Sequence, residues 1–234
     1  VTKYQLVCRL LLEKKKDEWR VVEEAIAEGQ TPGAVILVGQ KDQVLYHEAF
    51  GHRMLLPEPR PMTRDTIFDL ASLTKPLATA TAILHLAERG RLLLQDPVSV
   101  YLPSFTGEGR EQATLLHLLT HTAGLPAYKN YLSALGEQVP PHQRRARVVE
   151  DICTLPLEYP VGERFSYSCL GYILLASVVE IVSGQPLNCY CARHVYAPLE
   201  MADTCFNPGP QMRHRCAATE QLAEGVLVGV VHDE

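Results

Sequence analysis

The feature that most constrains the fold is a long apolar segment, "SYSCLGYILLASVVEIVSG", at residues 166–184. Its side chains are apolar almost all round a helix from Leu170 to Val182, and a helix of that kind has to be enclosed by other elements. No apolar run in the chain reaches the roughly 18 residues needed to span a bilayer. The segment therefore predicts a central buried helix, and we expect no membrane span.

The elements around this helix follow the order helix, hairpin, helical region and strand. Apolar positions at helical spacing predict a first helix over residues 4–28, ended by Gly29. Two β-branched runs, residues 34–38 and 44–50, are separated by the polar turn "GQKDQ" and predict a β-hairpin. Further elements are predicted as helices at residues 74–90, 113–126, 144–155 and 185–199 and as a strand in the tail "EGVLVGVVHDE".

This order predicts an α/β part that is interrupted by an all-α part. We expect residues 1–62 to form the N-terminal helix and hairpin, residues 63–220 the helical part, and residues 221–234 a return strand. The predicted fold class is α/β plus all-α, with an incomplete antiparallel sheet, an N-terminal helix and a large helical subdomain.

Charge and cysteine content exclude some functions. The net charge of −5 provides no basic surface for nucleic acid, and the basic runs at residues 14–16 and 144–145 are interpreted as solvated helix faces. Seven cysteines, an odd number, argue against a complete disulfide framework and favour a cytoplasmic location. A periplasmic or secreted location stays open because the sequence does not begin with Met. The "CYCARH" segment at residues 189–194 lacks the usual Cys-x-x-Cys spacing, so we prefer thiols over metal ligands there and expect no metal or cofactor.

The segment "ASLTKP" at residues 71–76 contains a Ser-x-x-Lys motif, Ser72 and Lys75, of which a chain of this length contains about one by chance. Pro76 fits the first turn of a helix, so Ser72 is predicted at a helix start, where free N–H groups favour a developing negative charge. Lys75 then lies on the same face, and the positive field and partial burial predict a lowered pKa for its amine. The alternative is an N-cap serine beside a solvent-facing lysine.

Several longer segments carry a family resemblance. The strand segments "PGAVILVG" and "VLYHEAFG" are followed in order by "FDLASLTKPLATATAILHLAERGRLLLQDPVSVYLP", "LLTHTAGLP", "PVGERFSYSCLGYILLASVVEIVSGQPL" and "VYAPLEMADTCF". Together they resemble the serine β-lactamase and penicillin-binding protein family, especially its class C branch with the related esterases and D-aminopeptidases. The resemblance extends from near Thr31 to the last residue and implies a β-lactamase/transpeptidase-like fold.

The resemblance also implies roles for individual residues. By it, Ser72 is the acylated nucleophile and Lys75 its general-base partner. Tyr167, in "YSC", stands where the family has the tyrosine of its Tyr-x-Asn motif, which passes protons between nucleophile, leaving group and lysine. A literal Tyr-x-Asn at Tyr128 is set aside, because it lies in a predicted loop and does not follow a Pro-x-Gly turn. The histidines near these segments are interpreted as hydrogen-bonded structural residues: His47, His117 and His121.

The sequence departs from the family pattern in two places. Cys169 occupies the position of the family's Asn or Asp, and we prefer a packing role for it over a thiol with a lowered pKa, with substrate positioning weakened either way. The family's third motif, Lys-Thr-Gly or His-x-Gly on a strand facing the nucleophile, has no match in the 234 residues. We therefore expect a second chain, a homodimer partner or a rearrangement to cover the hairpin edge, unless the chain is a fragment of a longer parent. His232 and Asp233 are given a minor role at the rim of the site.

The sequence thus predicts a serine hydrolase that forms an acyl-enzyme on Ser72 and acts on a small-molecule ester, β-lactam or D-amino-acid amide. Ester or promiscuous β-lactam hydrolysis ranks above peptidase activity, because the lost third motif weakens carboxylate recognition. The alternative is a catalytically impaired binding or scaffold protein with the same fold.

Overall fold

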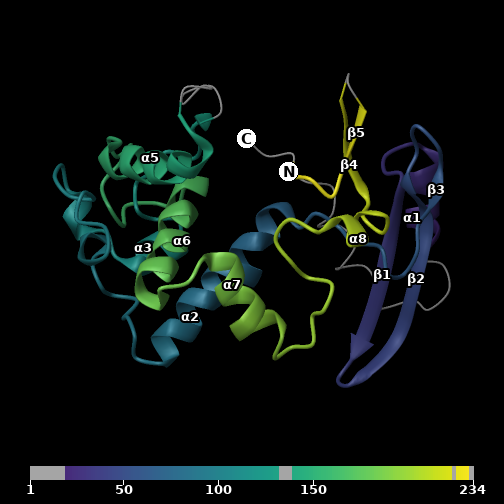
Figure 1. Ribbon diagram of the computed structural model, residues 1–234, viewed down its shortest axis with the longest axis horizontal. Helices are drawn as coiled ribbons and strands as arrows, with labels where there is room; N and C mark the ends of the chain where they lie inside the picture. The colour runs from purple at the N-terminus through teal and green to yellow at the C-terminus, as the bar shows by residue number, and fades with distance from the viewer. Residues whose placement is uncertain (1–18, 132–138, 223–224, 232–234) are drawn as a thin grey trace. The chain divides into compact units, whose positions relative to one another are not determined.

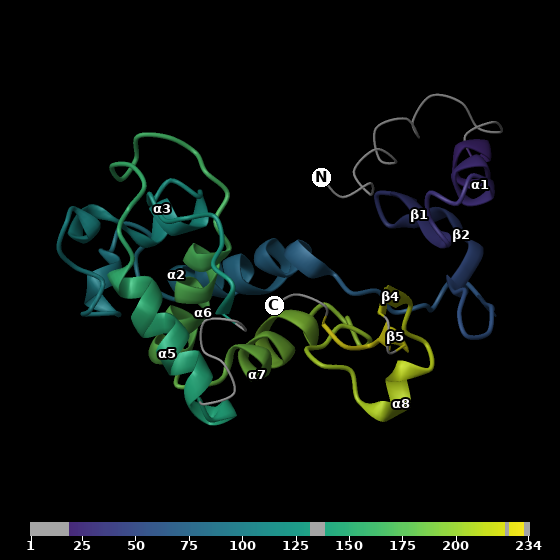
Figure 2. The same ribbon diagram turned by 90° about the horizontal axis from the view of Figure 1, so that it is seen from above.

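The computed structural model describes residues 19–131, 139–222 and 225–231 (Figures 1 and 2). Contacts between residues divide it into two compact units. The helical unit is Leu70–Phe206, and the strand unit combines the residues up to Asp69 with Asn207–His232. The mixed composition of the two units confirms the predicted class, α/β plus all-α, while the boundaries at residues 62 and 220 stay a prediction.

The strand unit contains the predicted β-hairpin. β1 (Gly33–Gln40) and β2 (Gln43–Met54) pair antiparallel, and β3 (Arg60–Pro61) lies along the other side of β2. The register places Val35 opposite Ala49. Both hairpin strands are rich in the β-branched and aromatic residues that favour this conformation. The hairpin prediction is confirmed, and each strand extends beyond the predicted segment at both ends.

Helix α1 (Arg20–Ala27) precedes the hairpin and contacts β2. Trp19, just before the helix, stacks on Tyr46 of β2 with ring centroids 3.8 Å apart. After the helix the chain turns at Gly29, whose φ of 69° is a left-handed conformation that glycine adopts without steric cost. The predicted helix end is confirmed, whereas residues 4–18 of the predicted helix lie outside the described residues.

A second, two-stranded antiparallel sheet follows the short helix α8 (Pro210–Arg213). Its strands are β4 (Ala218–Leu222) and β5 (Gly225–Val228). The tail strand is confirmed over β5, but its partner β4 escaped prediction because "ATEQL" holds a single β-branched residue. The Arg215 guanidinium donates to the Asp65 carbonyl at 2.8 Å, which ties this segment to the residues that precede the helical unit.

The helical unit is built around α6 (Cys169–Ser183), and Figures 1 and 2 show α3 and α5 beside it. Ser168 begins α6 as its N-cap by accepting the Gly171 N–H, and Gly184 follows the helix with a φ of 70°. The prediction of a central buried helix is confirmed. The buried residues of α6 are Leu170, Gly171, Leu174, Leu175, Ser177, Val178 and Val179.

Shorter helices surround α6, and two of them adjoin wider turns. A π-helix, Lys75–Ala80, leads into α2, and another, Ala192–Tyr196, follows α7. The segments predicted as helices at residues 74–90, 144–155 and 185–199 are helical over most of their length. The helices around α6 are α2 (Thr81–Glu88), α3 (Leu115–Leu119), α5 (Pro141–Thr154) and α7 (Leu187–Cys191).

The helix predicted over residues 113–126 is wrong beyond its first turns. Helix α3 ends at Leu119, and the chain then turns through His121 and Gly124, with φ of 58° and 81°. Gly124 lies so close to the next segment that a Cβ on it would sit 2.3 Å from the Tyr159 carbonyl oxygen. The apolar spacing of the segment is helical, but this close packing requires a left-handed glycine.

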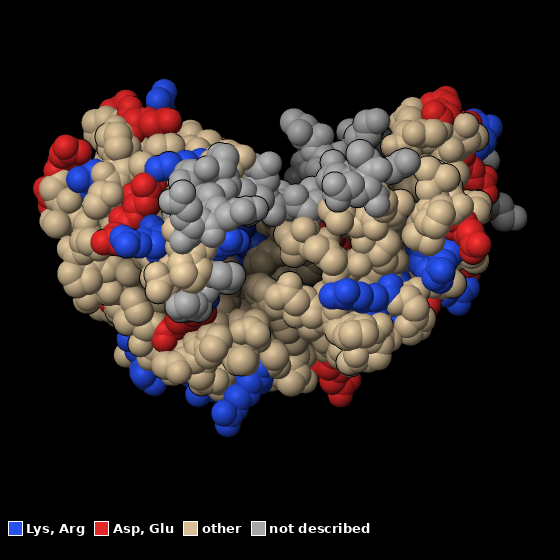
Figure 3. All heavy atoms as spheres, turned by 45° about the horizontal axis from the view of Figure 1, so that its top comes forward, with Lys and Arg blue, Asp and Glu red and all other residues tan. Residues whose placement is uncertain are grey.

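The surface carries both signs of charge, as Figure 3 shows for one face, where Lys and Arg are interspersed with Asp and Glu. Within the described ranges, no single helix is both long and apolar enough to cross a bilayer. Among the described residues, one pair of consecutive helices, α6 and the segment Leu187–Tyr196, is together long and apolar enough, but the two helices meet at an angle of 72°.

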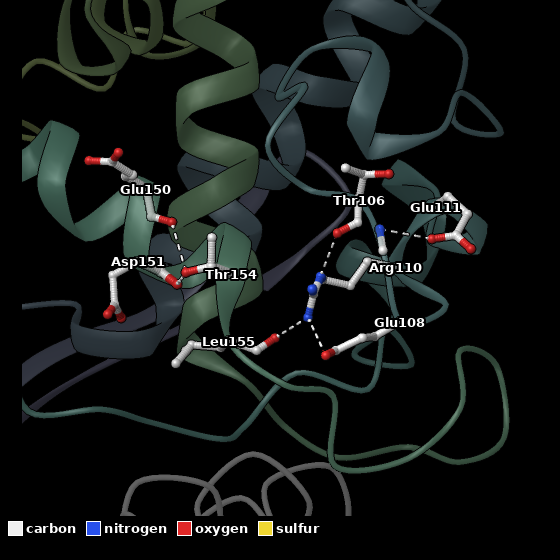
Figure 4. A network of polar contacts seen from close by, with 9 residues as sticks. Thr106, Glu108, Arg110, Glu111, Glu150, Asp151, Thr154 and Leu155 are labelled. Carbon is white, nitrogen blue, oxygen red and sulfur yellow. Dashed lines mark hydrogen bonds and ion pairs between the residues drawn. The ribbon is translucent and has the colours of Figure 1, made fainter.

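A buried arginine joins two parts of the helical unit (Figure 4). Arg110 is 7% exposed, and its Nε donates to the Thr106 carbonyl at 3.1 Å. One Nη donates to the Leu155 carbonyl at 2.7 Å and forms an ion pair with Glu108 at 3.2 Å. Leu155 is the C-cap of α5, where a cation interacts favourably with the helix dipole. Arg110 therefore fixes the loop before α3 to the end of α5.

We predict that Arg110→Ala lowers the free energy of unfolding by about 2–4 kcal/mol, because it removes two charge-assisted hydrogen bonds to partly buried carbonyl groups. Glu108→Ala is the matched control and should cost less than about 1 kcal/mol, because that carboxylate is exposed. Urea denaturation followed by circular dichroism measures both. Equal effects of the two variants would show that the carbonyl contacts contribute little.

Candidate active site

Ser72 lies in a short 3₁₀ turn, Ala71–Leu73, that leads through Thr74 into the π-helix Lys75–Ala80. Pro76 is in the first turn of that helix, where its missing N–H removes no needed bond. The Thr81 hydroxyl donates to the Pro76 carbonyl at 2.7 Å and so occupies an acceptor that the widened turn exposes. The predicted position of Ser72 at a helix start is confirmed, and its side chain is accessible.

Two side chains from different parts of the chain meet at the Ser72 hydroxyl. The Lys75 amine donates to Ser72 Oγ at 3.2 Å, which confirms that the two residues share a face. The Tyr167 hydroxyl, from the segment before α6, donates to the same oxygen at 2.8 Å. The Lys75 Nζ also lies 5.0 Å from the centroid of the Tyr167 ring. The structure therefore brings together the three residues that the sequence singled out.

The pKa of Lys75 is raised, which corrects the lowered value expected from the sequence. Burial is the largest influence and lowers the pKa, but a hydrogen bond with Tyr167 and interactions with Cys169 and Tyr167 together outweigh it. These partners come from a distant segment, so an argument based on the helix start alone did not include them. The amine is an ammonium at neutral pH.

Cys169 is the first residue of α6 and is half-buried. Its thiol interacts with the Lys75 amine, and its N–H donates to the Ala127 carbonyl at 2.9 Å. The side chain thus lies at the site, whereas the sequence favoured a packing role. A thiol donates and accepts hydrogen bonds only weakly, so it orients the amine less firmly than an amide would.

His121 lies at this site, although the sequence indicated only a hydrogen-bonded structural residue. Its ring lies against the Tyr167 ring, with centroids 4.6 Å apart, and its carbonyl accepts the Ser166 N–H at 2.9 Å. Burial, and next the positive charge of Lys75, lower the pKa of His121. The prediction that His121 is hydrogen-bonded is confirmed. His121 lies beside Tyr167 because the chain turns after α3. The apolar spacing of that segment predicted a continuous helix instead of this turn.

The other candidates lie elsewhere. His117 caps α3, with its Nδ1 2.9 Å from the Thr114 hydroxyl, which confirms its structural role. The tyrosine hydroxyl bonded to Ser72 belongs to Tyr167, not to Tyr128. In the part of the chain that the structure describes, no three His, Cys, Asp or Glu side chains gather as metal ligands. His232 and Asp233 lie outside the described residues.

Comparisons with known proteins place this geometry in context. The beta-lactamase family model matches residues 20–231. An N-acetylmuramyl-L-alanine amidase of Bacillus subtilis is 32% identical over 242 residues, which cover 92% of this chain and 55% of that relative. The octameric penicillin-binding protein homologue from Pyrococcus abyssi is 27% identical with a TM-score of 0.72, covering 92% of this chain and 51% of that one. The hydrolase EstCE1, with promiscuous acyltransferase activity, is 28% identical with a TM-score of 0.73, covering 92% and 58%.

The chain therefore spans only about half the length of the proteins that it resembles. The family match nevertheless includes both segments of the site, the turn that carries Ser72 and Lys75 and the helix start that carries Tyr167. The family resemblance and the fold predicted from the sequence are thus confirmed. The chain belongs to the beta-lactamase family.

Proposed function

We propose that this chain is a serine hydrolase that forms an acyl-enzyme on Ser72. The observation that carries the proposal is the convergence of Lys75 and Tyr167 on the exposed Ser72 hydroxyl, at 3.2 and 2.8 Å. A serine nucleophile needs a group that takes its proton within hydrogen-bond reach, and the Tyr167 oxygen lies at that distance, with the Lys75 ammonium beside it. The names of the amidase and of EstCE1 describe acyl-transfer chemistry, which supports the same reaction class.

In the proposed acylation step, Ser72 Oγ attacks the substrate carbonyl carbon and its proton passes to the Tyr167 oxygen, 2.8 Å away. In the same step the Tyr167 hydroxyl gives its own proton to the leaving group, as the bond from the carbonyl carbon to that group breaks. Because the raised pKa keeps Lys75 protonated, we assign it the role of a cation that stabilises the negative charge developing on these oxygens. In deacylation, water attacks the acyl carbonyl carbon and gives a proton to the Tyr167 oxygen, and Tyr167 returns its hydroxyl proton to Ser72 Oγ as the acyl–serine bond breaks.

The substrate that we propose is a neutral ester or β-lactam with an apolar acyl part. Apolar side chains beside the nucleophile and the proton acceptor are exposed: Leu73 at 58% and Phe165 at 68%.

We predict that Ser72→Ala abolishes both covalent labelling by a fluorescent penicillin and hydrolysis of a chromogenic short-chain ester, because it removes the attacking oxygen. The control is Ser104→Ala, an exposed serine of the same unit, which should behave like the original chain. Equal labelling of the Ser72 variant and the original chain would refute the assignment of the nucleophile. Labelling without turnover would favour the alternative, a catalytically impaired binding protein of the same fold.

We predict that Lys75 titrates at a higher pH in the folded chain than in the chain unfolded in urea, because its pKa is raised by Tyr167 and Cys169 against the effect of burial. Its contribution to stability is then present at neutral pH and is lost as the pH rises through the raised value. Tyr167→Phe removes the hydrogen bond and should lower the pH at which Lys75 titrates. NMR of the chain with lysines labelled at Cε measures this pH, and Lys75→Arg identifies the Lys75 resonance. An unchanged titration midpoint in Tyr167→Phe would contradict the proposed cause.

We further propose that a second copy of the chain covers the outer edge of β1, since β1 is the end strand of its sheet among the described residues. Leu37, at 58% exposure, adds apolar surface to this strand. We predict a concentration-dependent dimer in sedimentation velocity, weakened about tenfold or more by Leu37→Lys. Thr120→Lys, on the helical unit, is the control. A monomer at all concentrations would refute the proposal.

A further inference from the structure

We propose that His121 is the positioning residue for Tyr167, and that its neutral imidazole and its carbonyl hold the Tyr167 hydroxyl on Ser72. The catalytic meaning of this arrangement rests on the proposed function. The arrangement itself is a property of the fold and can be measured separately. His121 does not contact the reacting oxygen in this proposal; it acts through the segment that carries Tyr167.

Two hydrogen bonds to His121 lie on either side of Tyr167 in the chain. The Ser166 N–H donates to the His121 carbonyl at 2.9 Å, and the Ser168 N–H donates to His121 Nδ1 at 3.1 Å. Both neighbours of Tyr167 are therefore attached to one residue, which restricts rotation of the backbone between them. The Ser168 hydroxyl adds a bond to the Pro126 carbonyl at 2.7 Å and so holds the same segment from the other direction.

The imidazole also contacts the rings around it. The His121 ring centroid is 4.6 Å from that of Tyr167 and 5.1 Å from that of Tyr172, with tilts of 36° and 31°. The Phe165 ring meets it edge-on at 5.8 Å. The Tyr172 hydroxyl donates to the Leu119 carbonyl at 3.1 Å, which links this aromatic cluster back to the end of α3. The phenol of Tyr167 is thus supported on its ring as well as through its backbone.

The backbone conformation of His121 indicates that its side chain has a role. Its φ of 58° lies in the left-handed region, which glycine adopts freely and residues with a side chain adopt only at a cost. If this residue served only to form the turn, a glycine would adopt the same φ without strain. A histidine at this position adds an acceptor for the Ser168 N–H, which glycine lacks, and the acceptor requires an unprotonated Nδ1.

The charged and titratable groups that face His121 agree with a neutral imidazole. Burial disfavours a charged imidazole, and the Lys75 ammonium opposes a second positive charge, so the pKa of His121 is lowered. The other titratable neighbours are Tyr167, Tyr172 and His117, the last of which lines the same small cavity. Protonation in acid would direct a second N–H at the Ser168 N–H, and two donors cannot bond to each other. The support of Tyr167 is then lost.

The test compares His121→Gly, which keeps the turn but removes the acceptor, with His121→Asn, which keeps both the left-handed preference and an acceptor oxygen. With a chromogenic ester, we expect His121→Gly to lower kcat about 10- to 100-fold with little change in KM, because the proton acceptor is misplaced. We expect His121→Asn to stay within about threefold of the original kcat and to lose the acid limb of the pH–kcat profile that reports His121. His117→Ala is the control, and should keep that limb.

A second measurement separates this proposal from the proposed function. Amide hydrogen exchange at Ser166 and Ser168 should be slow in the original chain, faster at Ser168 in His121→Gly and slow again in His121→Asn. Unchanged exchange in His121→Gly, or an acid limb that persists in His121→Asn, would overturn the positioning role. If exchange responds as expected while the original chain hydrolyses no ester and binds no penicillin, the support of Tyr167 stands and the proposed function falls.

Discussion

The burial of α6 is the constraint on which the rest of the helical unit depends. A helix that is apolar on all sides is stable in water only when other elements enclose it, and each fully buried Leu or Val contributes about 1.5–3 kcal/mol relative to exposure. Helices α2, α3, α5 and α7 all contact α6, as does the π-helix that carries Lys75. Leu118 of α3 packs on Gly171, where an added Cβ would lie 3.4 Å from the Leu118 side chain. The same packing that forms the core therefore sets the distance between Ser72 and the start of α6.

Two strained backbone positions adjoin the two halves of the site. Ala71, immediately before Ser72, has a φ of 44°, and His121, against Tyr167, has a φ of 58°. Such conformations cost of order 1–3 kcal/mol for residues other than glycine and persist only where the surroundings determine them. Here the surroundings are the helices packed on α6, whose stability offsets the strain. Ser72 and Tyr167 are thus presented from turns that would not form in an isolated segment.

The sequence predicted the elements whose signal is local. The apolar run of α6, the β-branched runs of the hairpin and the placement of Pro76 each depend on neighbouring residues, and all three predictions are confirmed. The site was predictable as a set of residues because the motif segments around Ser72 and Tyr167 resemble a known family. The turn at His121 was missed because it depends on contacts between distant segments, and the strand β4 was missed because its sequence holds a single β-branched residue.

The charge of the site shows why such contacts matter. When only the helix start is considered, Lys75 lies in the positive field of the free N–H groups, and a lowered pKa is expected. The structure adds interactions with the side chains of Tyr167 and Cys169, and with these the pKa of Lys75 is raised instead of lowered. The Lys75 ammonium gives the site a positive charge before substrate arrives. A neutral carbonyl compound gains little from that charge until its oxygen becomes anionic, so the interaction strengthens mainly in the transition state. A carboxylate substrate would gain from it already in the ground state, and this difference is the physical argument for the neutral esters that we propose as substrates.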